Sequence, residues 1–269
     1  INQASGVIVV TGAKGSGKST TLAGILHEID SEERLTLTAE DPIDYDFGGH
    51  IQQVPLNRAE GQTYAELLSL LAEQDPDILL IGEAIDPETA ESCMDAAEKG
   101  HLVFTTMYAN SSSSALGRLI DMKVPIYKIK ASLRGVLAQQ LFGKVCPACS
   151  IERPMTELEA QLTTLPNGTT VRVAKILNRE EQQQGQDNGS LCKLCHGRGY
   201  LGCIAAYEFL EMNPSIKDAI NAKTSSEDIQ KAAINSGMTT LKQYAIELVR
   251  QKLTTVDEVK RVCGHSVEN

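Results

Sequence analysis

The stretch Gly12–Ser19, GAKGSGKS, constrains the fold of this chain more than any other. It follows an apolar run, GVIVVT, and it precedes a segment, residues 19–29, with apolar residues at helical spacing. The stretch matches GxxxxGK[ST] in full and lies in the strand–loop–helix context that this motif requires. Its glycines allow backbone N–H groups to turn inward around phosphates. The sequence therefore predicts a nucleoside triphosphate site, and a Gly-rich turn without a ligand is the weaker interpretation.

Each residue type in such a loop has a chemical task. Lys18 can reach the β- and γ-phosphates, and the Ser19 hydroxyl can ligate Mg²⁺. The start of the following helix adds unpaired N–H donors and the positive end of its dipole. We expect the nucleotide to be held by Gly12, Ala13, Lys14, Gly15, Ser16, Gly17, Lys18, Ser19 and Thr20.

Apolar strands alternate with helices from Gly6 to about Thr106. The expected strands are GVIVVTG, RLTLTAED, DILLIGE and HLVFTT, and the helices include YAELLSLLAEQD and DPETAESCMDAAEKG. In the last of these helices we expect Asp86 as N-cap, Pro87 in the first turn and Gly100 past the end. This alternation predicts an α/β domain with a mostly parallel sheet.

The pattern changes beyond Pro125. A helix is expected through IYKIKASLRGVLAQQLF, and the polar stretch REEQQQGQDNGS is expected to be a loop or locally disordered. After YEFLEM the chain should be helical, with capping patterns at Ser225–Asp228 and Thr255–Glu258. The predicted regions are a phosphate-loop core at 1–141, a subdomain containing two CxxC pairs at 142–205 and a C-terminal helical region at 206–269.

Acidic residues follow two of the expected strands. Glu83 ends DILLIGE, and AEDPIDY places Glu40, Asp41 and Asp44 after the second strand. The carboxyl ends of parallel strands border the ligand crevice, where one acid can hold Mg²⁺ or its waters and another can orient the attacking water. Each cluster alone is as compatible with an N-cap or a solvated loop. Both lie at strand ends beside a phosphate loop, which favours function.

His101 opens the next strand, after a glycine that ends the preceding helix. A lone histidine is more often structural, and its place here also makes it a candidate γ-phosphate sensor. The predicted catalytic residues are Glu83, Glu40, Asp44 and His101.

Four of the seven cysteines form two CxxC pairs, Cys146/Cys149 and Cys192/Cys195. An odd number of cysteines does not favour a disulfide framework, and it fits reduced thiols. Two such pairs supply four thiolates for tetrahedral Zn²⁺, which would be structural because no ligand position is left for water. Two unrelated thiol pairs are the alternative.

The 269 residues carry a formal net charge of -10, with a pI of about 5.1. This acidity argues against a nucleic-acid backbone as the main partner. The sequence contains no apolar run approaching the roughly 18 to 20 residues that a membrane-spanning helix needs.

The quoted motifs resemble those of the secretion ATPases that drive type II secretion and type IV pilus assembly. The matching segments are GVIVVTGAKGSGKSTTL, TAEDPIDY, DPDILLIGEAIDPETA, GHLVFTTMYAN and VCPAC…CKLCHGRGYLG…YEFL. They correspond, in family order, to the Walker A loop, Asp box, Walker B segment, His box and tetracysteine, and they cover nearly the whole chain. The tetracysteine resembles that of extension ATPases, because retraction ATPases generally lack it.

The resemblance implies a RecA-like P-loop core that hydrolyses ATP with Mg²⁺ and a structural Zn²⁺. It implies a homo-hexamer with ATP bound between subunits, and further domains N-terminal to Ile1. It also implies a cytoplasmic motor that docks peripherally on a platform protein of a bacterial inner membrane, with no nucleic-acid partner. Lys18, Ser19, Glu83, Glu40 and Asp41 match family motif positions, and His101 matches the first histidine of the His box.

The chain departs from the family pattern at several positions. Asp44 replaces a usual glutamate, Tyr108 stands where a second histidine is usual, and Gln140 and Cys203 stand where arginines are common. Missing arginines remove candidate groups for neutralising the phosphoryl transition state. Two alternatives to a motor therefore stay open: a nucleotide-bound structural or regulatory subunit with weak hydrolysis, and a zinc-containing nucleic-acid ATPase. The acidic charge and the lack of interleaved aromatic and basic residues count against the second.

Overall fold

The computed structural model describes residues 4–29, 32–84 and 86–264. The chain forms two compact units, unit 1 (residues 1–139 and 208–239) and unit 2 (residues 140–207 and 240–269). The C-terminal helices are thus shared between the two units. The three predicted regions, with boundaries at 141/142 and 205/206, remain a prediction about separate domains.

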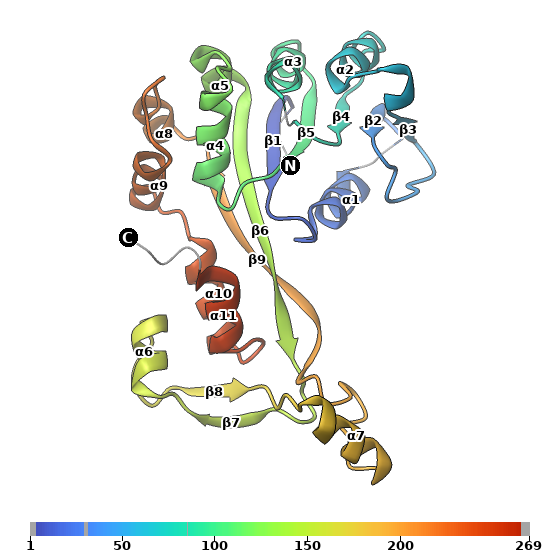
Figure 1. Cartoon of the computed structure of the whole chain (residues 1–269). Helices are drawn as coiled ribbons and strands as arrows, with labels where there is room; N and C mark the ends of the chain where they lie inside the picture. Colours follow the sequence, from blue (N-terminus) through green and yellow to red (C-terminus); the bar gives the residue numbers. More distant parts are fainter. Residues whose placement is uncertain (1–3, 30–31, 85, 265–269) are drawn as a thin grey trace. The chain divides into compact units, whose positions relative to one another are not determined.

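A seven-stranded sheet organises unit 1, in the order β3-β2-β4-β5-β1-β6-β9 (Figure 1). Every pairing from β3 across to β6 is parallel, which confirms the predicted α/β class. The last residues of β6 and the first of β9 belong to unit 2. The strands are β1 (Gly6–Thr11), β2 (Thr36–Glu40), β3 (Ile51–Pro55), β4 (Ile78–Ile81), β5 (Leu102–Met107), β6 (Leu133–Val145) and β9 (Tyr200–Glu211).

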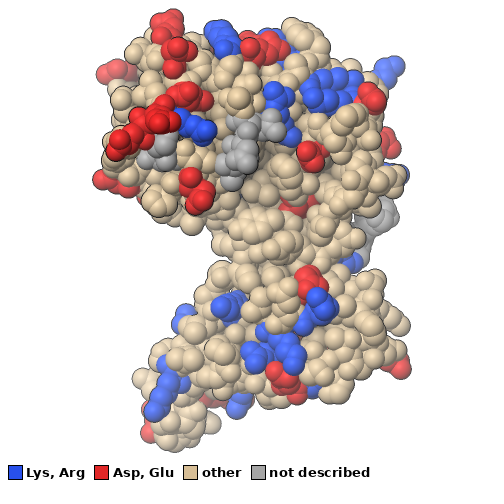
Figure 2. All heavy atoms as spheres, turned by 180° about the vertical axis from the view of Figure 1, so that it is seen from behind, with Lys and Arg blue, Asp and Glu red and all other residues tan. Residues whose placement is uncertain are grey.

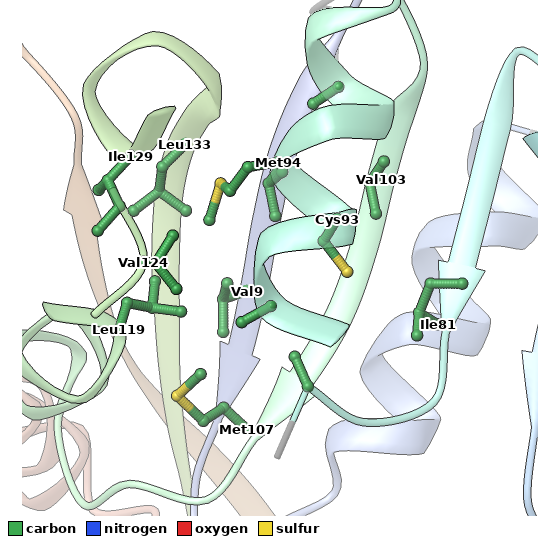
Figure 3. Packing of buried hydrophobic residues seen from close by; sticks show 14 of the residues in the cluster. Val9, Ile81, Cys93, Met94, Val103, Met107, Leu119, Val124, Ile129 and Leu133 are labelled. Carbon is green, nitrogen blue, oxygen red and sulfur yellow. The ribbon is translucent and has the colours of Figure 1, made fainter. Parts of the chain in front are cut away.

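The helices of unit 1 cover both faces of this sheet (Figure 1). One face packs on α1 through a cluster that includes Leu26 and Phe104. The other face packs on the remaining helices through a larger cluster, part of which is drawn in Figure 3 around Met94 and Leu119. The helices of unit 1 are α1 (Lys18–Ile29), α2 (Tyr64–Ala72), α3 (Pro87–Glu98), α4 (Ser112–Asp121), α5 (Ile126–Ser132), α8 (Pro214–Ala219) and α9 (Ser226–Asn235), with a 3₁₀ turn at Arg58–Glu60.

Helix starts follow the capping chemistry of the sequence. The Asp86 carboxylate accepts from the Thr89 N–H at the start of α3, where Pro87 occupies the first turn. The predicted caps Ser225 and Thr255 likewise accept from the N–H groups three residues on. A side-chain cap removes one unpaired donor, typically about 1 kcal/mol, and so fixes where each helix begins.

The helix predicted from Pro125 through Phe142 is wrong beyond Ser132. The chain turns there into β6, which pairs in parallel with β1 from Val7↔Leu133 onward. Gly135 lowers helix propensity, and a Cβ at this position would lie 2.5 Å from Phe209 Cζ. Pairing β6 with the otherwise open edge of β1 decides the outcome, and this long-range partner is invisible to local periodicity.

Unit 2 contains β7 (Ile151–Pro154) and β8 (Thr170–Val173), which pair antiparallel. Its helices are α6 (Glu157–Thr163), α7 (Arg179–Asp187), α10 (Leu241–Arg250) and α11 (Val256–Cys263). The loop predicted for REEQQQGQDNGS is wrong, because α7 forms there behind a capping box of Asn178 and Glu181. Among the helices of the described ranges, none combines the length and apolar content of a membrane span.

Candidate functional site

The loop between β1 and α1 has the backbone geometry of a phosphate cradle. Gly12, Gly15 and Gly17 have φ of 153°, 78° and 88°, a region that L side chains rarely adopt. A Cβ on Gly12 would lie 2.4 Å from both the Gln139 carbonyl oxygen and Ser16 Oγ. The Ser16 hydroxyl is buried and has no hydrogen-bond partner among the described residues. Glycine is thus required by the close approach as well as by the dihedral angles.

Lys18 lies at the centre of this loop. Its Nζ donates to the carbonyl oxygens of Gly12 (2.9 Å) and Ala13 (3.1 Å) and lies 4.5 Å from the ring centroid of Tyr108. Burial lowers the pKa of Lys18, and the charge of Glu83 opposes this shift. The ammonium therefore feels the negative charge of Glu83.

Gln139 on β6 braces the loop from the side. Its Nε2 donates to the Ser16 carbonyl oxygen (2.7 Å), and its Oε1 accepts from the Thr21 hydroxyl (2.6 Å). The sequence pattern does not reveal the role of Gln139, because the apolar spacing of this segment predicts a helix and not a strand beside β1. One amide side chain thus ties the loop to the start of α1.

Glu83 follows β4 at the carboxyl end of the sheet. Hydrogen bonds from the Gly82 and Ala84 N–H groups to the Ala39 and Thr106 carbonyl oxygens (2.8 and 2.9 Å) fix its backbone between neighbouring strands. The charge of Glu83, with burial and a hydrogen bond, raises the pKa of Tyr108. Glu83, Tyr108 and Lys18 therefore come together in one cluster.

The acidic residues at the end of β2 and in the following loop lie in three different environments. Glu40 is buried, and its Oε1 accepts from the Thr38 hydroxyl (2.6 Å) and from Gln53 Nε2 (2.9 Å). Asp41 forms an ion pair with Arg58, and Asp44 lies exposed in the following loop. In the same loop, the Tyr45 hydroxyl lies 2.6 Å from Thr20 Oγ1 at the start of α1. The loop that carries these acids thus touches the phosphate loop's helix.

The geometry argues against His101 as a phosphate sensor. In the parallel register Gly6 pairs with Leu102 and Thr11 with Met107, so His101 lies at the amino end of the strands. The phosphate loop follows Thr11 at the opposite edge. His101 is buried, and its Nδ1 lies 2.6 Å from the Pro76 carbonyl oxygen, which gives the ring a structural contact. The prediction failed because His101 precedes its strand, whereas the phosphate loop follows its own strand. In a parallel sheet these two positions lie at opposite edges.

A pocket of about 440 Å³ lies beside the loop. It is lined by Gly12 and Ala13, by Tyr108 and Asn110 after β5, and by Arg118 on α4. Arg118 Nη1 donates to the Tyr108 carbonyl oxygen (2.9 Å), which holds a cationic group at the rim. The position of Arg118 at this pocket could not be predicted from the sequence, because a single arginine on a helix belongs to no motif.

The four cysteines of the two CxxC pairs come together in unit 2. Their sulfur atoms all lie within 4.8 Å of one another, with Cys146–Cys192 at 3.8 Å and Cys149–Cys195 at 3.5 Å. Zinc–sulfur bonds of about 2.3 Å at tetrahedral angles give sulfur–sulfur distances of about 3.8 Å. The Gly199 N–H also donates to Cys195 Sγ (3.3 Å). The donor set and its spacing fit a tetrahedral metal site.

The pKa values of two cysteines in this cluster, Cys192 and Cys149, are shifted in opposite directions. Backbone N–H donors of Cys195 and Leu194 lower the pKa of Cys192 to about 6. Burial, with hydrogen bonds from the other thiols, raises the pKa of Cys149. Thiolate character is therefore favoured at Cys192, and a cation is what would favour it at Cys149.

Comparison with known proteins matches residues 1–261 to the family model "Type II/IV secretion system protein". The chain is 36% identical over 259 residues to the type IV pilus assembly ATPase PilB of Thermus thermophilus, covering 96% of this chain and 28% of that protein. It is 36% identical over 262 residues to the type II secretion system protein E of Pectobacterium carotovorum, covering 97% and 49%.

Solved structures give the same picture. The pilus retraction motor PilT with bound ADP superposes with a TM-score of 0.65 at 25% identity, covering 97% of this chain and 62% of that one. The Legionella pneumophila ATPase DotB has a TM-score of 0.68 at 18% identity, with coverage of 98% and 61%, and supports the fold. The chain spans about half the length of the type II relative and less of the Thermus one. From the family match and these identities, the chain belongs to the type II/IV secretion system protein family.

Proposed function

We propose that this chain is the ATP-hydrolysing core of a motor for type II secretion or type IV pilus assembly. The observation that supports it most is the glycine loop at the carboxyl edge of the sheet, where Lys18 Nζ donates to the Gly12 and Ala13 carbonyl oxygens (2.9 and 3.1 Å) and where Glu83 follows β4 at the same edge. Relatives at 36% identity are named as a pilus assembly ATPase and a secretion protein E.

The residues divide the chemistry of hydrolysis among themselves. The N–H groups of residues 12–19 hold the triphosphate, and the Lys18 ammonium neutralises charge that develops on it. Glu83 orients the attacking water and accepts its proton, while Glu40 and Asp44 are the further acids of this edge. Mg²⁺, held by the Ser19 hydroxyl when bound, supplies further charge neutralisation. His101 is left out, because it lies at the opposite edge.

Glu83→Gln tests this assignment in the intact protein. The amide keeps the size of the side chain and removes its basicity, so phosphate release should fall about 100-fold or more while nucleotide binding persists. Steady-state phosphate release and titration calorimetry with ATP measure the two effects. Phosphate release by the wild type no faster than by Glu83→Gln would defeat the motor proposal.

That outcome would favour the second candidate, a nucleotide-bound structural or regulatory subunit. The observation behind it is Tyr108, whose ring covers the Lys18 ammonium at 4.5 Å and which stands where the family usually has a histidine. Under this candidate calorimetry still detects ATP binding, and turnover stays at the level of Glu83→Gln.

The same proposal includes a structural Zn²⁺ and an assembly. The four sulfur atoms of residues 146, 149, 192 and 195 have the number and spacing that Zn²⁺ takes when no position is left for water. We place the motor as a homo-hexamer on the cytoplasmic face of a bacterial inner membrane, docked peripherally on a platform protein and without nucleic acid. Sedimentation with and without an ATP analogue tests the hexamer, and salt-sensitive DNA binding would contradict the last point.

A further inference from the structure

The side chain of Gln53 makes three hydrogen bonds around the acidic edge of unit 1. Its Nε2 donates to Glu40 Oε1 (2.9 Å) and to the Tyr45 carbonyl oxygen (2.8 Å), and its Oε1 accepts from the Phe47 N–H (3.0 Å). The two acceptors and one donor fix which end of the amide is nitrogen. No other residue type of this size offers two donors and one acceptor in a plane.

Glu40 receives both of its side-chain hydrogen bonds on one oxygen. Thr38 and Gln53 both donate to Oε1, and no described residue donates to Oε2. Thr38 and Glu40 alternate along β2 with Leu37 and Ala39, which belong to the cluster on the far face from α1. Glu40 therefore lies on the α1 face, with one oxygen committed to the protein and the other available.

Tyr45 extends this set of contacts to the phosphate loop. Gln53 holds the Tyr45 carbonyl, and the Tyr45 hydroxyl lies 2.6 Å from Thr20 Oγ1. The segment 41–50 is otherwise largely exposed, so its position depends on a few such contacts. The contacts run without a break from Glu40 through Gln53 and Tyr45 to Thr20.

We propose that Gln53 is a positioning residue that holds the Glu40 carboxylate and the loop 41–50 in a fixed relation to the helix carrying the phosphate loop. The inference rests on the proposed hydrolysis at this site. Gln53 lies on β3, outside the phosphate loop, and it acts through Glu40 and Tyr45. Its removal leaves the nucleotide cradle intact and lets Glu40 turn away.

A double-mutant cycle between Gln53→Ala and Glu40→Gln tests this in the intact protein. Gln53→Ala should lower kcat about 10- to 100-fold, because a misplaced catalytic group costs this much. The Kd for ATP should change less than about 2-fold. In the Glu40→Gln background the same substitution should lower kcat clearly less than in the wild-type background, because the carboxylate that Gln53 positions is already gone and only the contact with Tyr45 is lost. Equal losses in both backgrounds, or no loss in the first, would overturn the proposal.

Two further variants keep the test decisive. Gln52→Glu on the same strand is the matched control for Gln53→Glu, because Gln52 is exposed and the charge change is identical. Gln53→Glu places a carboxylate against Glu40 and should lower kcat as Gln53→Ala does, whereas Gln52→Glu should not. If Gln53→Ala does not fold, Gln53→Asn, shorter by one methylene, takes its place in the cycle.

Glu83→Gln measured alongside separates the two proposals. Full phosphate release by Glu83→Gln would show that this acidic edge does not carry out the hydrolysis on which the inference rests. If Glu83→Gln loses phosphate release and the Gln53 variants keep it in full, only the positioning role of Gln53 is contradicted.

Discussion

The two units of this chain are stabilised by different means. Unit 1 buries a separate apolar cluster on each face of a mostly parallel sheet, with Phe104 on one face and Met94 on the other fully enclosed. Unit 2 has a two-stranded sheet, a cluster of four cysteines and polar contacts such as the Gly143 N–H to Glu258 Oε1 (2.7 Å). A metal held by the four cysteines would add to the stability of this smaller unit.

Charge separates the units as well. Unit 1 holds 13 Lys and Arg against 25 Asp and Glu, and unit 2 holds 12 against 10. Unit 1 therefore has a formal charge of -12 and unit 2 one of +2, which together give the net charge of -10. Figure 2 shows acidic side chains gathered over one side of unit 1 and mostly basic ones on the face of unit 2 in view. The average composition of the chain does not reveal this division. The low pI, which counts against a nucleic-acid backbone as partner, therefore describes unit 1 and not unit 2.

Removing the metal should give the largest effect, and it should fall on unit 2. Structural Zn²⁺ contributes about 10 kcal/mol or more, so chelation or Cys192→Ser should unfold the segment from Phe142 to about Tyr207. ATP binding by unit 1 should survive. Metal analysis should find one zinc per chain, and hydrogen exchange should show the loss confined to this segment.

Cys203→Ser is the matched control, because Cys203 is an exposed cysteine of unit 2 outside the cluster. Purified protein without zinc, or unfolding that reaches the phosphate loop, would contradict this prediction.

A cavity in unit 1 should give the next largest effect. Phe104 is fully buried beneath α1, so Phe104→Ala should lower the free energy of unfolding by about 3–5 kcal/mol. Denaturant unfolding followed by ATP binding measures it. Retention of zinc by the variant would sharpen the contrast between the units, and loss of zinc together with ATP binding would show that they unfold as one.

Lys18→Ala should change binding in unit 1 without changing its stability. Loss of a charge-assisted hydrogen bond to phosphate costs about 1.5–3 kcal/mol, so the Kd for ATP should rise about 10- to 100-fold. Calorimetry with ATP measures it, and Lys99→Ala, an exposed lysine at the end of α3, is the control. Full affinity in Lys18→Ala would remove the basis of the nucleotide site.

The smallest effect is expected from an ion pair of unit 2. Arg153 donates twice to Glu159 (2.7 Å each), and this contact lowers the pKa of Glu159 to about 2. A carboxylate with a depressed pKa stabilises the fold above its unfolded pKa of about 4.3 and loses this contribution as the pH falls toward 2. Glu159→Gln keeps the capping acceptor and should cost about 0.5–1 kcal/mol at neutral pH.

Thermal unfolding between pH 7 and pH 2 checks that the difference between Glu159→Gln and wild type disappears in acid. Glu157→Gln, an exposed neighbour on α6, should show no such difference. A gap that persists at pH 2 would rule out the ion pair as its cause.

The sequence alone determined the features that depend on local chemistry. The phosphate loop can be predicted from Gly12, Gly17 and Lys18. Its motif consists of glycines and a lysine at fixed spacing within one short segment, so that no distant residue is needed to recognise it. The same holds for the cap at Asp86 and for the pairing of the two CxxC motifs. The capping box of Asn178 and Glu181 was equally readable, although the polar composition of α7 masked it.

Tertiary structure decided the rest. β6 becomes a strand because the edge of β1 is there to pair with, and this brings Gln139 to the phosphate loop. Sheet direction, which no local pattern records, puts His101 at the edge opposite the phosphate loop. Gln53 and Glu40 meet because β3 and β2 are neighbours in register. Side chains far apart in sequence act together only where strand order and direction place them side by side, and that is the long-range information that short motifs lack.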